Sequence, residues 1–140
     1  MAKHRYHDNL RKVPLFADLS DDELDAVGRT ATELSFEPGR ILMKEGEMGH
    51  EMVIVLEGTL EVTRDGRHIA DIGPGGFAGE MALLTHATRN STVAASTPVV
   101  VIHLDGRSFS GLLQDVPRIA VGMLPIVAGR AAAHSDDHTH

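Results

Sequence analysis

With 140 residues and a formal net charge of −7, the chain is long enough for one domain with its own core and too short for a sensing domain joined to a full effector domain. It has no cysteine, which excludes disulfides, thiol catalysis and cysteine-bound metal and leads us to expect a reducing, cytoplasmic location. The acidic balance argues against nucleic acid or an anionic membrane as a partner, and the longest mostly apolar run, residues 119–129, is too short to span a bilayer.

The N-terminal part of the chain divides into a polar stretch and a well-marked helix start. Residues 1–12 have mixed charge and no apolar period, so we expect a flexible N-terminal segment without the apolar core of a secretion signal. After it, Ser20 suits an N-cap, Glu23 completes a capping box, and Leu19 and Leu24 form a hydrophobic staple. The pattern predicts an amphipathic helix that covers an apolar sheet.

From residue 32 onward, short apolar or alternating runs are separated by Gly, Pro and Asp, as is typical of β-strands. The predicted strands are residues 33–36, 40–44, 52–57, 59–64, 67–72, 91–97 and 99–104. Asp65-Gly66 is the strongest hairpin signal, because a tight primed turn needs positive φ angles there. So many short strands indicate a sandwich or a barrel.

The C-terminal part is predicted to be helical. Asp105 can cap a helix that runs to about Gln114, and Pro117 suits the first turn of another. The second helix is apolar nearly all round, and Pro125 is expected to kink or stop it near residues 121–124. Residues 131–140, rich in His and Asp, are expected to form a disordered tail.

The segment from Gly75 to Val93 carries the sharpest functional signal. Its glycines let the backbone approach a ligand closely, and residues 80–84 can form a helical turn whose free N–H groups attract an anion. Arg89 adds a planar, permanently charged fork that can hold two phosphate oxygens at once. Glu80 would repel a phosphate, so its carboxylate is better suited to accept from hydroxyl groups such as those of a ribose.

These residues resemble the phosphate-binding cassette of the cyclic nucleotide-binding domain family, in which Phe-Gly-Glu-(aliphatic)-Ala-Leu-Leu is followed by Arg-x-Ala-Thr-Val. The matching positions are Gly79, Glu80, Ala82, Leu83, Leu84, Arg89, Thr92 and Val93. The resemblance covers Leu15 to about Gln114 and includes the motifs Glu45-Gly46-Glu47-x-Gly49 and Leu56-Glu57-Gly58.

The resemblance implies a mainly β fold, a β-roll or jelly roll with helices at its N- and C-terminal ends, over residues 13–130. It further implies a non-catalytic sensor whose ligand is a cyclic nucleotide. By resemblance, Arg89 pairs with the cyclic phosphate, Glu80 accepts from the ribose 2′-hydroxyl, and the N–H groups of Gly79, Met81 or Ala82 complete the cradle.

Asn90 and Ser91 complete the set of expected ligand-binding residues. In some members of the family, a hydroxyl directly after the arginine accompanies cyclic GMP, and Asn90 does not supply one. The resemblance therefore favours cyclic AMP as the ligand, with cyclic GMP as the alternative.

The resemblance also implies that residues 117–130 form a mobile lid, with Ile119, Met123 or Leu124 as its contacts. No helix-turn-helix follows this segment, in contrast to the transcription factors of the family. The expected output is therefore an effector protein of unknown identity, self-association, or buffering of the nucleotide.

Two other functional classes remain open from the sequence. The fold could have lost its ligand and serve as a protein-interaction module, with an apolar patch around residues 119–127. A cupin-like metalloenzyme is disfavoured, because His50, His68, His86 and His103 lie on separate predicted elements. Glu80 has no recognisable catalytic partner, so no catalytic residue, no metal site and no cofactor are expected.

Overall fold

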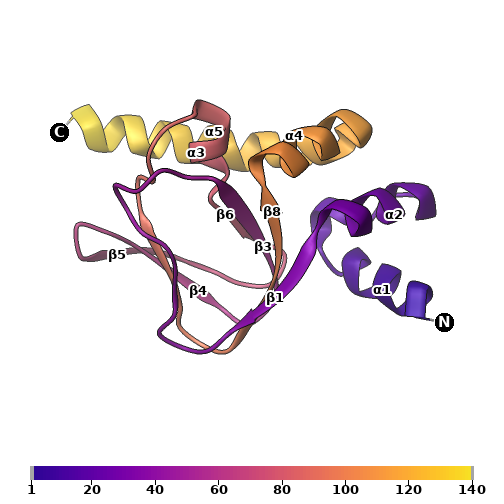
Figure 1. Ribbon diagram of the computed structural model, residues 1–140. Coiled ribbons are helices and arrows are strands. Elements are labelled where there is room, and N and C mark those ends of the chain that lie inside the picture. The colour runs from indigo at the N-terminus through magenta and orange to yellow at the C-terminus, as the bar shows by residue number, and fades with distance from the viewer. Residues whose placement is uncertain (1, 140) are drawn as a thin grey trace.

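The computed structural model describes residues 2–139, and it describes side chains for residues 7–133. The helices are α1 (Ala2–Arg11), the 3-10 helix η1 (Pro14–Phe16), α2 (Asp21–Thr30), α3 (Glu80–Thr85), α4 (Gly106–Asp115) and α5 (Pro117–Thr139). The strands are β1 (Thr32–Phe36), β2 (Ile41–Met43), β3 (Glu51–Glu57), β4 (Leu60–Arg64), β5 (Arg67–Ile72), β6 (Phe77–Ala78), β7 (Thr92–Ala95) and β8 (Val99–Asp105). In Figure 1, α1 and α2 lie to the right of the strands, and α3, α4 and α5 lie along the top.

The strands form two four-stranded antiparallel sheets, in the orders β1-β8-β3-β6 and β2-β7-β4-β5. Along β3, neighbouring side chains alternate between two cores, because successive residues of a strand point to opposite faces. Val53 and Val55 join the core between the sheets, while Met52 and Ile54 join a second core beneath the helices. This arrangement is the expected β-roll, an antiparallel sandwich with flanking helices.

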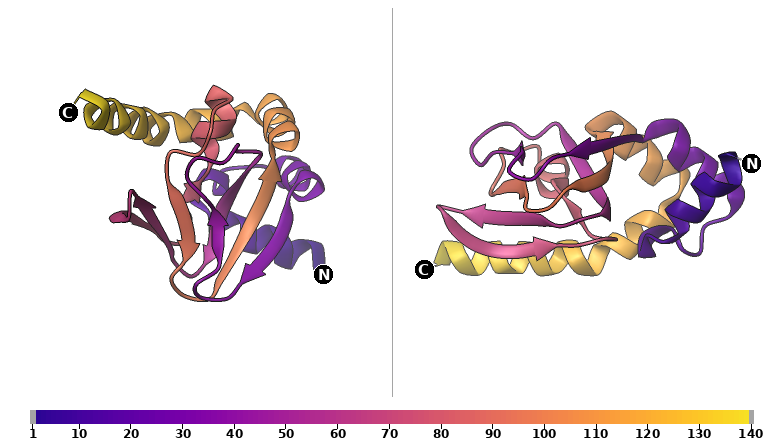
Figure 2. Two further views of the ribbon diagram at one scale, coloured as in Figure 1. Left: turned by 60° about the vertical axis from the view of Figure 1, so that its left-hand side comes forward. Right: turned by 90° about the horizontal axis from the view of Figure 1, so that it is seen from below.

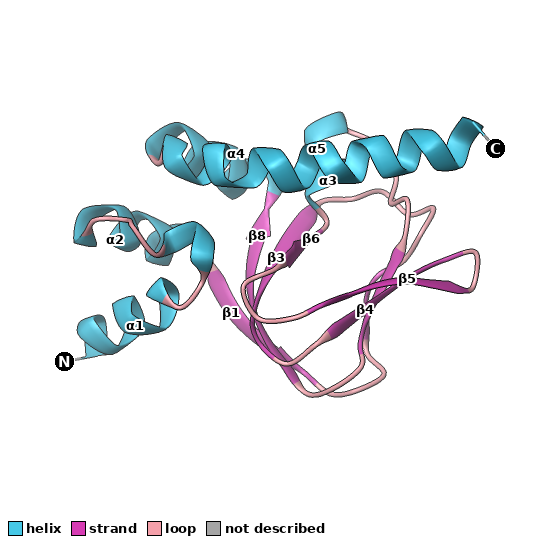
Figure 3. Ribbon diagram, turned by 180° about the vertical axis from the view of Figure 1, so that it is seen from behind, coloured by secondary structure: helices cyan, strands magenta, loops and turns pink. Residues whose placement is uncertain are grey.

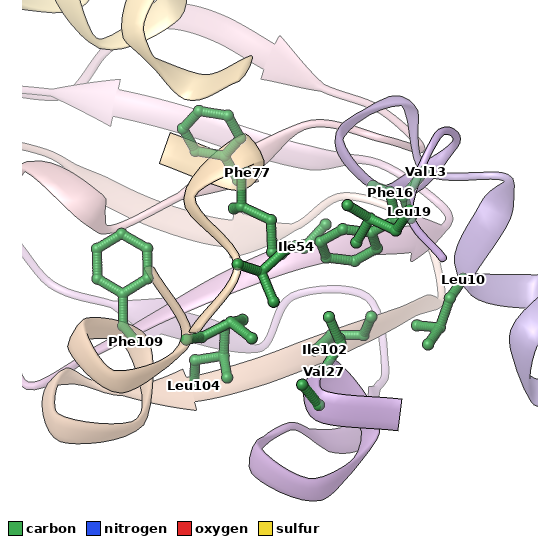
Figure 4. Packing of buried hydrophobic residues seen from close by; sticks show 14 of the residues in the cluster. Leu10, Val13, Phe16, Leu19, Val27, Ile54, Phe77, Ile102, Leu104 and Phe109 are labelled. Atoms are coloured by element: carbon green, nitrogen blue, oxygen red, sulfur yellow. The ribbon is translucent and has the colours of Figure 1, made fainter. Parts of the chain in front are cut away.

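The second core holds the helices against the sheet that contains β3 and β8. Phe16, Val27 and Phe109 pack there with Ile54 and Leu104, so η1, α2 and α4 share one apolar centre (Figure 4). Seen from behind, α4 and α5 run across the top of the strands and α1 and α2 lie at one end (Figure 3). The sheet is therefore covered on one face by helices and on the other by the second sheet.

Most of the predicted elements are present where the sequence placed them. The capping box at the start of α2 is formed, with the Glu23 amide donating to Ser20 Oγ and the Ser20 amide donating to the Glu23 carboxylate. Asp65 and Gly66 both have positive φ, as a primed hairpin turn between β4 and β5 requires. Each predicted strand overlaps an observed one, and only the two-residue strand β6 was not predicted.

The N-terminal segment differs from the expectation of a flexible stretch, because residues 2–11 form helix α1. Among the side chains of α1 that the structure describes, residues 7–11, Leu10 is the one apolar member, and it is fully buried. Polar contacts attach the helix to α2: His7 Nε2 lies 2.7 Å from Asp25 Oδ1, and Arg11 donates to Asp21 at 2.7 Å. These contacts with α2 stabilise α1 although its sequence shows no amphipathic pattern.

The C-terminal helix also differs from the expectation. Pro125 does not end α5, which continues to Thr139 through the stretch that was expected to be disordered. A proline removes only one hydrogen-bond donor, and the carbonyl that loses it belongs to Val121, which is exposed and can be hydrated. Within residues 2–139, no single helix is long and apolar enough to cross a membrane; α4 and α5 meet that test only as a pair bent by 115°.

Candidate functional site

A cavity of about 270 Å³ lies between the β4–β5 hairpin, the turn into α3 and the C-terminal half of α5. In Figure 2, α5 extends along the same side of the molecule as this hairpin. All of the predicted site residues line the cavity, namely Gly79, Glu80, Met81, Ala82, Arg89, Asn90 and Ser91. The rest of the wall includes apolar side chains of β4, β5 and β7 together with Arg64, Asp71 and Arg130.

Arg89 lines the cavity with only 7% of its surface exposed. Its Nη1 donates to the Gly79 carbonyl at 2.9 Å, its Nη2 donates to the Glu51 carbonyl at 2.6 Å, and the Glu51 carboxylate lies 3.3 Å away. The Arg89 amide donates to the Glu47 carbonyl, which fixes the backbone as well. A guanidinium with five N–H groups retains donors after these contacts and is already oriented for an anion.

Two glycines allow the backbone to come this close to the guanidinium. Gly79 has a φ of +94°, and a Cβ there would lie 2.8 Å from Arg89 Nη1 and 2.9 Å from the Glu51 carbonyl oxygen. A Cβ on Gly49 would lie 3.0 Å from Arg89 Cζ and would collide with Ala82. Any larger residue at either position would therefore displace the guanidinium or the first turn of α3.

Glu80, the first residue of α3, has a buried carboxylate with one unused oxygen. The side chain is 1% exposed, Oε1 pairs with Arg130 of α5, and Oε2 has no hydrogen-bond partner among the described residues. A buried carboxylate oxygen without a donor is costly, and a ligand hydroxyl in the cavity would supply the missing hydrogen bond.

The first turn of α3 adds backbone donors to the same wall. Gly79 is its N-cap, and the amides of the first helical residues, including Met81 and Ala82, have no acceptor within their own helix. These N–H groups, Arg89 and Glu80 Oε2 are complementary to a ligand that carries both an anion and a hydroxyl.

The C-terminal helix contributes to the site through residues other than the predicted lid contacts. Arg130 Nη2 donates to the Phe77 carbonyl at 2.7 Å, and its guanidinium lies 4.8 Å from the Phe77 ring centroid. Ile119 and Met123 are instead buried in the helical core, and Leu124 is exposed. The α5 residues that line the cavity, Arg130 and Ala133, therefore lie about two to four helical turns beyond the predicted lid contacts.

Asn90 and Ser91 lie where the chain passes from Arg89 into β7. The Ser91 hydroxyl donates to Asn90 Oδ1 at 3.1 Å, and Arg64 of β4 contacts both residues. Among the side chains that the structure describes, no three His, Cys, Asp or Glu residues converge on a position that could hold a metal ion.

The comparisons with known proteins agree with this geometry. The sequence model of the cyclic nucleotide-binding domain matches residues 33–116, more than half of the chain. The chain belongs to the cyclic nucleotide-binding domain family. Cyclic nucleotide-binding domains are regulatory and are not catalytic in themselves.

Its relatives include both channels and kinase regulators. The chain is 34% identical to a cyclic nucleotide-gated potassium channel of Mesorhizobium japonicum over 77% of its length, and 34% identical to a cAMP-dependent protein kinase regulatory subunit of Yarrowia lipolytica over 79%. It spans 30% of each of these relatives. The cAMP-bound PfPKA-R structure superposes with a TM-score of 0.81 at 27% identity, covering 95% of this chain and 46% of that one.

Several residues that the structure places at the site had no predicted role, among them Arg64, Arg130 and Glu51. For Arg130 a signal was available, since it is the only charged residue between positions 119 and 133 and an isolated charge on an apolar helix needs a partner. For Arg64 and Glu51 no comparable signal exists, because charged residues at strand ends are common.

Proposed function

We propose that this domain is a cytoplasmic sensor that binds a 3′,5′-cyclic nucleotide, cyclic AMP, without converting it, and acts through a partner protein or a second copy. The observation that carries the proposal is a single cavity whose wall contains a buried, oriented Arg89 and a buried Glu80, and one oxygen of this Glu80 has no donor among the described residues. A cyclic nucleotide carries one phosphate charge and one free ribose hydroxyl. The phosphate is complementary to the Arg89 guanidinium, and the hydroxyl can donate to Glu80 Oε2.

The phosphate is assigned to the Arg89 end. There the guanidinium offers its remaining N–H groups, and the first turn of α3 offers the amides of Met81 and Ala82. Because the chain carries a net charge of −7, affinity for an anion must come from such local donors.

The ribose is assigned to Glu80 and the base to the apolar part of the wall. Val62, Ile72 and Val93 provide a surface on which a flat base can be desolvated. Two observations favour adenine: Asn90 follows Arg89 without a hydroxyl, and the nearby Ser91 hydroxyl is already used in its bond to Asn90.

The output is assigned to α5. A ligand shifts a conformational equilibrium only when it binds two states differently. Arg130 of α5 pairs with Glu80 Oε1, so the helix is joined to the same carboxylate whose Oε2 is assigned to the ribose hydroxyl. The same helix exposes large apolar side chains, Val121 at 66%, Leu124 at 62% and Ile126 at 44%. An exposed apolar surface of this kind suits a partner protein or a second copy.

Isothermal titration with cyclic AMP and cyclic GMP tests the proposal. We expect the wild type to bind cyclic AMP with micromolar or tighter affinity and Arg89→Lys to lose about 30-fold, since a lysine cannot replace the fork. Arg67→Lys, at an exposed arginine of β5 outside the cavity, serves as the control and should bind like the wild type. Absence of binding by the wild type to either nucleotide would refute the proposal, and tighter binding of cyclic GMP would correct the choice of base.

A further inference from the structure

A second arginine of the cavity wall, Arg64 at the end of β4, is attached to the two residues that follow Arg89. Its Nε donates to the Asn90 carbonyl at 2.9 Å, and its Nη2 donates to Ser91 Oγ at 3.3 Å. One edge of the guanidinium thus contacts two consecutive residues in the segment that leads into β7. The chain of contacts continues from Ser91 Oγ to Asn90 Oδ1, so the Asn90 amide group is oriented as well.

This contact lies where a carbonyl oxygen would otherwise disturb an anion site. Asn90 lines the cavity directly after the phosphate-pairing Arg89, and an uncompensated carbonyl dipole there would repel a negatively charged ligand. Arg64 neutralises that carbonyl with a charge-assisted hydrogen bond and fixes the direction of the peptide group.

Arg64 also adds a positive charge to the cavity wall. Among the described residues, the charged side chains of this wall are those of Arg64, Arg89, Arg130, Asp71 and Glu80.

We propose that Arg64 is a positioning residue of the anion end of this site, which holds Asn90 and Ser91 in the orientation that a cyclic phosphate requires. The inference rests on the proposed function, because it assigns the anion to the Arg89 end. It depends on the fork of the guanidinium as well as on its charge, since Nε and Nη2 contact different residues and a lysine ammonium cannot reproduce both contacts.

The test uses the full chain with Arg64→Gln, Arg64→Lys and, as a matched control, Arg67→Gln. Arg67 lies opposite Arg64 in the same hairpin and is outside the cavity. The Arg67→Gln substitution therefore removes the same charge from the same pair of strands. We expect both Arg64 variants to bind cyclic AMP about tenfold more weakly and the Arg67 variant to change by less than about twofold. Adenosine, which lacks the phosphate, should bind all four proteins equally in an NMR titration.

Several outcomes would overturn the inference. Wild-type affinity in Arg64→Gln would show that Arg64 has no role, and full recovery in Arg64→Lys would show that charge alone matters. An equal loss for adenosine would assign Arg64 to the base or to general stability.

A measurement without ligand separates this inference from the proposed function. In the free protein, the amide resonances of Asn90 and Ser91 should shift in Arg64→Gln and stay in place in Arg67→Gln, with unchanged thermal midpoints. If the wild type binds no nucleotide, the proposed function fails, and unchanged Asn90 and Ser91 resonances would overturn the positioning role independently.

Discussion

At the scale of single residues, loss of the ion pair between Glu80 and Arg130 should lower the stability of the folded state. Glu80 is almost completely buried, while Arg130 is 32% exposed, so the carboxylate depends on the arginine more than the arginine depends on it. Removing only one partner of such a pair leaves an uncompensated buried charge.

We therefore expect Arg130→Met to lower the free energy of unfolding by about 1–3 kcal/mol, and the double variant Glu80→Gln/Arg130→Met to recover most of that loss. Urea unfolding at neutral pH measures both changes. The control is Arg118→Met on the same helix, where the guanidinium is exposed and donates to the Asp18 carbonyl. Equal losses in the single and double variants would contradict the electrostatic explanation.

The residues of the candidate site differ in how far the sequence could predict them. Arg89 and Glu80 were identifiable because they lie within one short segment, in which residue type and spacing carry the chemistry. Arg64 contacts Asn90 only because β4 and β7 are neighbours in a sheet, with Thr63 opposite Thr92. Such a neighbour depends on strand order, which a single sequence does not reveal.

At the scale of elements, α4 is a helix whose start depends on one ionised side chain. Asp105 Oδ1 accepts from the Ser108 amide at 2.7 Å, and this hydrogen bond lowers the pKa of Asp105 below its ordinary value of 3.8. The folded state therefore binds fewer protons than the unfolded state around that pH. The contribution is present at neutral pH and is lost as the pH falls through the folded pKa.

We expect Asp105→Asn, which caps without a charge, to flatten the acid limb of the stability profile. The urea midpoint of the wild type should fall more between about pH 5 and about pH 2 than that of the variant. Identical slopes for wild type and Asp105→Asn would show that this cap does not titrate on unfolding.

Prediction of the elements succeeded where local signals were sufficient. Alternating strands, the Asp65-Gly66 turn and the Ser20 capping box are encoded within a few residues. Helix α1 was missed because it is stabilised by contacts with α2. Helix α5 was expected to stop because the destabilising effect of Pro125 is visible in the local sequence, whereas the hydrogen bond from Arg130 to the Phe77 carbonyl is a tertiary contact. Tertiary contacts outweighed local preference in both cases.

At the scale of the whole molecule, the candidate site exists only in the folded state. Its wall extends from Met43 to Ala133 in the sequence and combines both sheets, α3 and α5. No short segment could bind the ligand alone, so binding should stabilise the folded state with little offset from the unfolded chain.

Cyclic AMP at about 100 times its dissociation constant should therefore add about 2.7 kcal/mol and raise the thermal midpoint by about 9 °C. Differential scanning fluorimetry measures the shift. At the same concentration Arg89→Lys should show a much smaller one, and adenosine 5′-monophosphate, whose phosphate is not cyclic, provides a ligand control. A shift of equal size in Arg89→Lys would place the binding elsewhere.

The pairing of β1 with β8 has a consequence for how the protein is made. Thr32 lies opposite His103, so the sheet that carries the helical core cannot close until the ribosome has released the chain beyond β8. Until then the β4–β5 hairpin is the main structure that nearby residues can form, and distant strand pairing is slow. A nascent chain therefore acquires its ligand site late and in one step, after Arg130 has emerged.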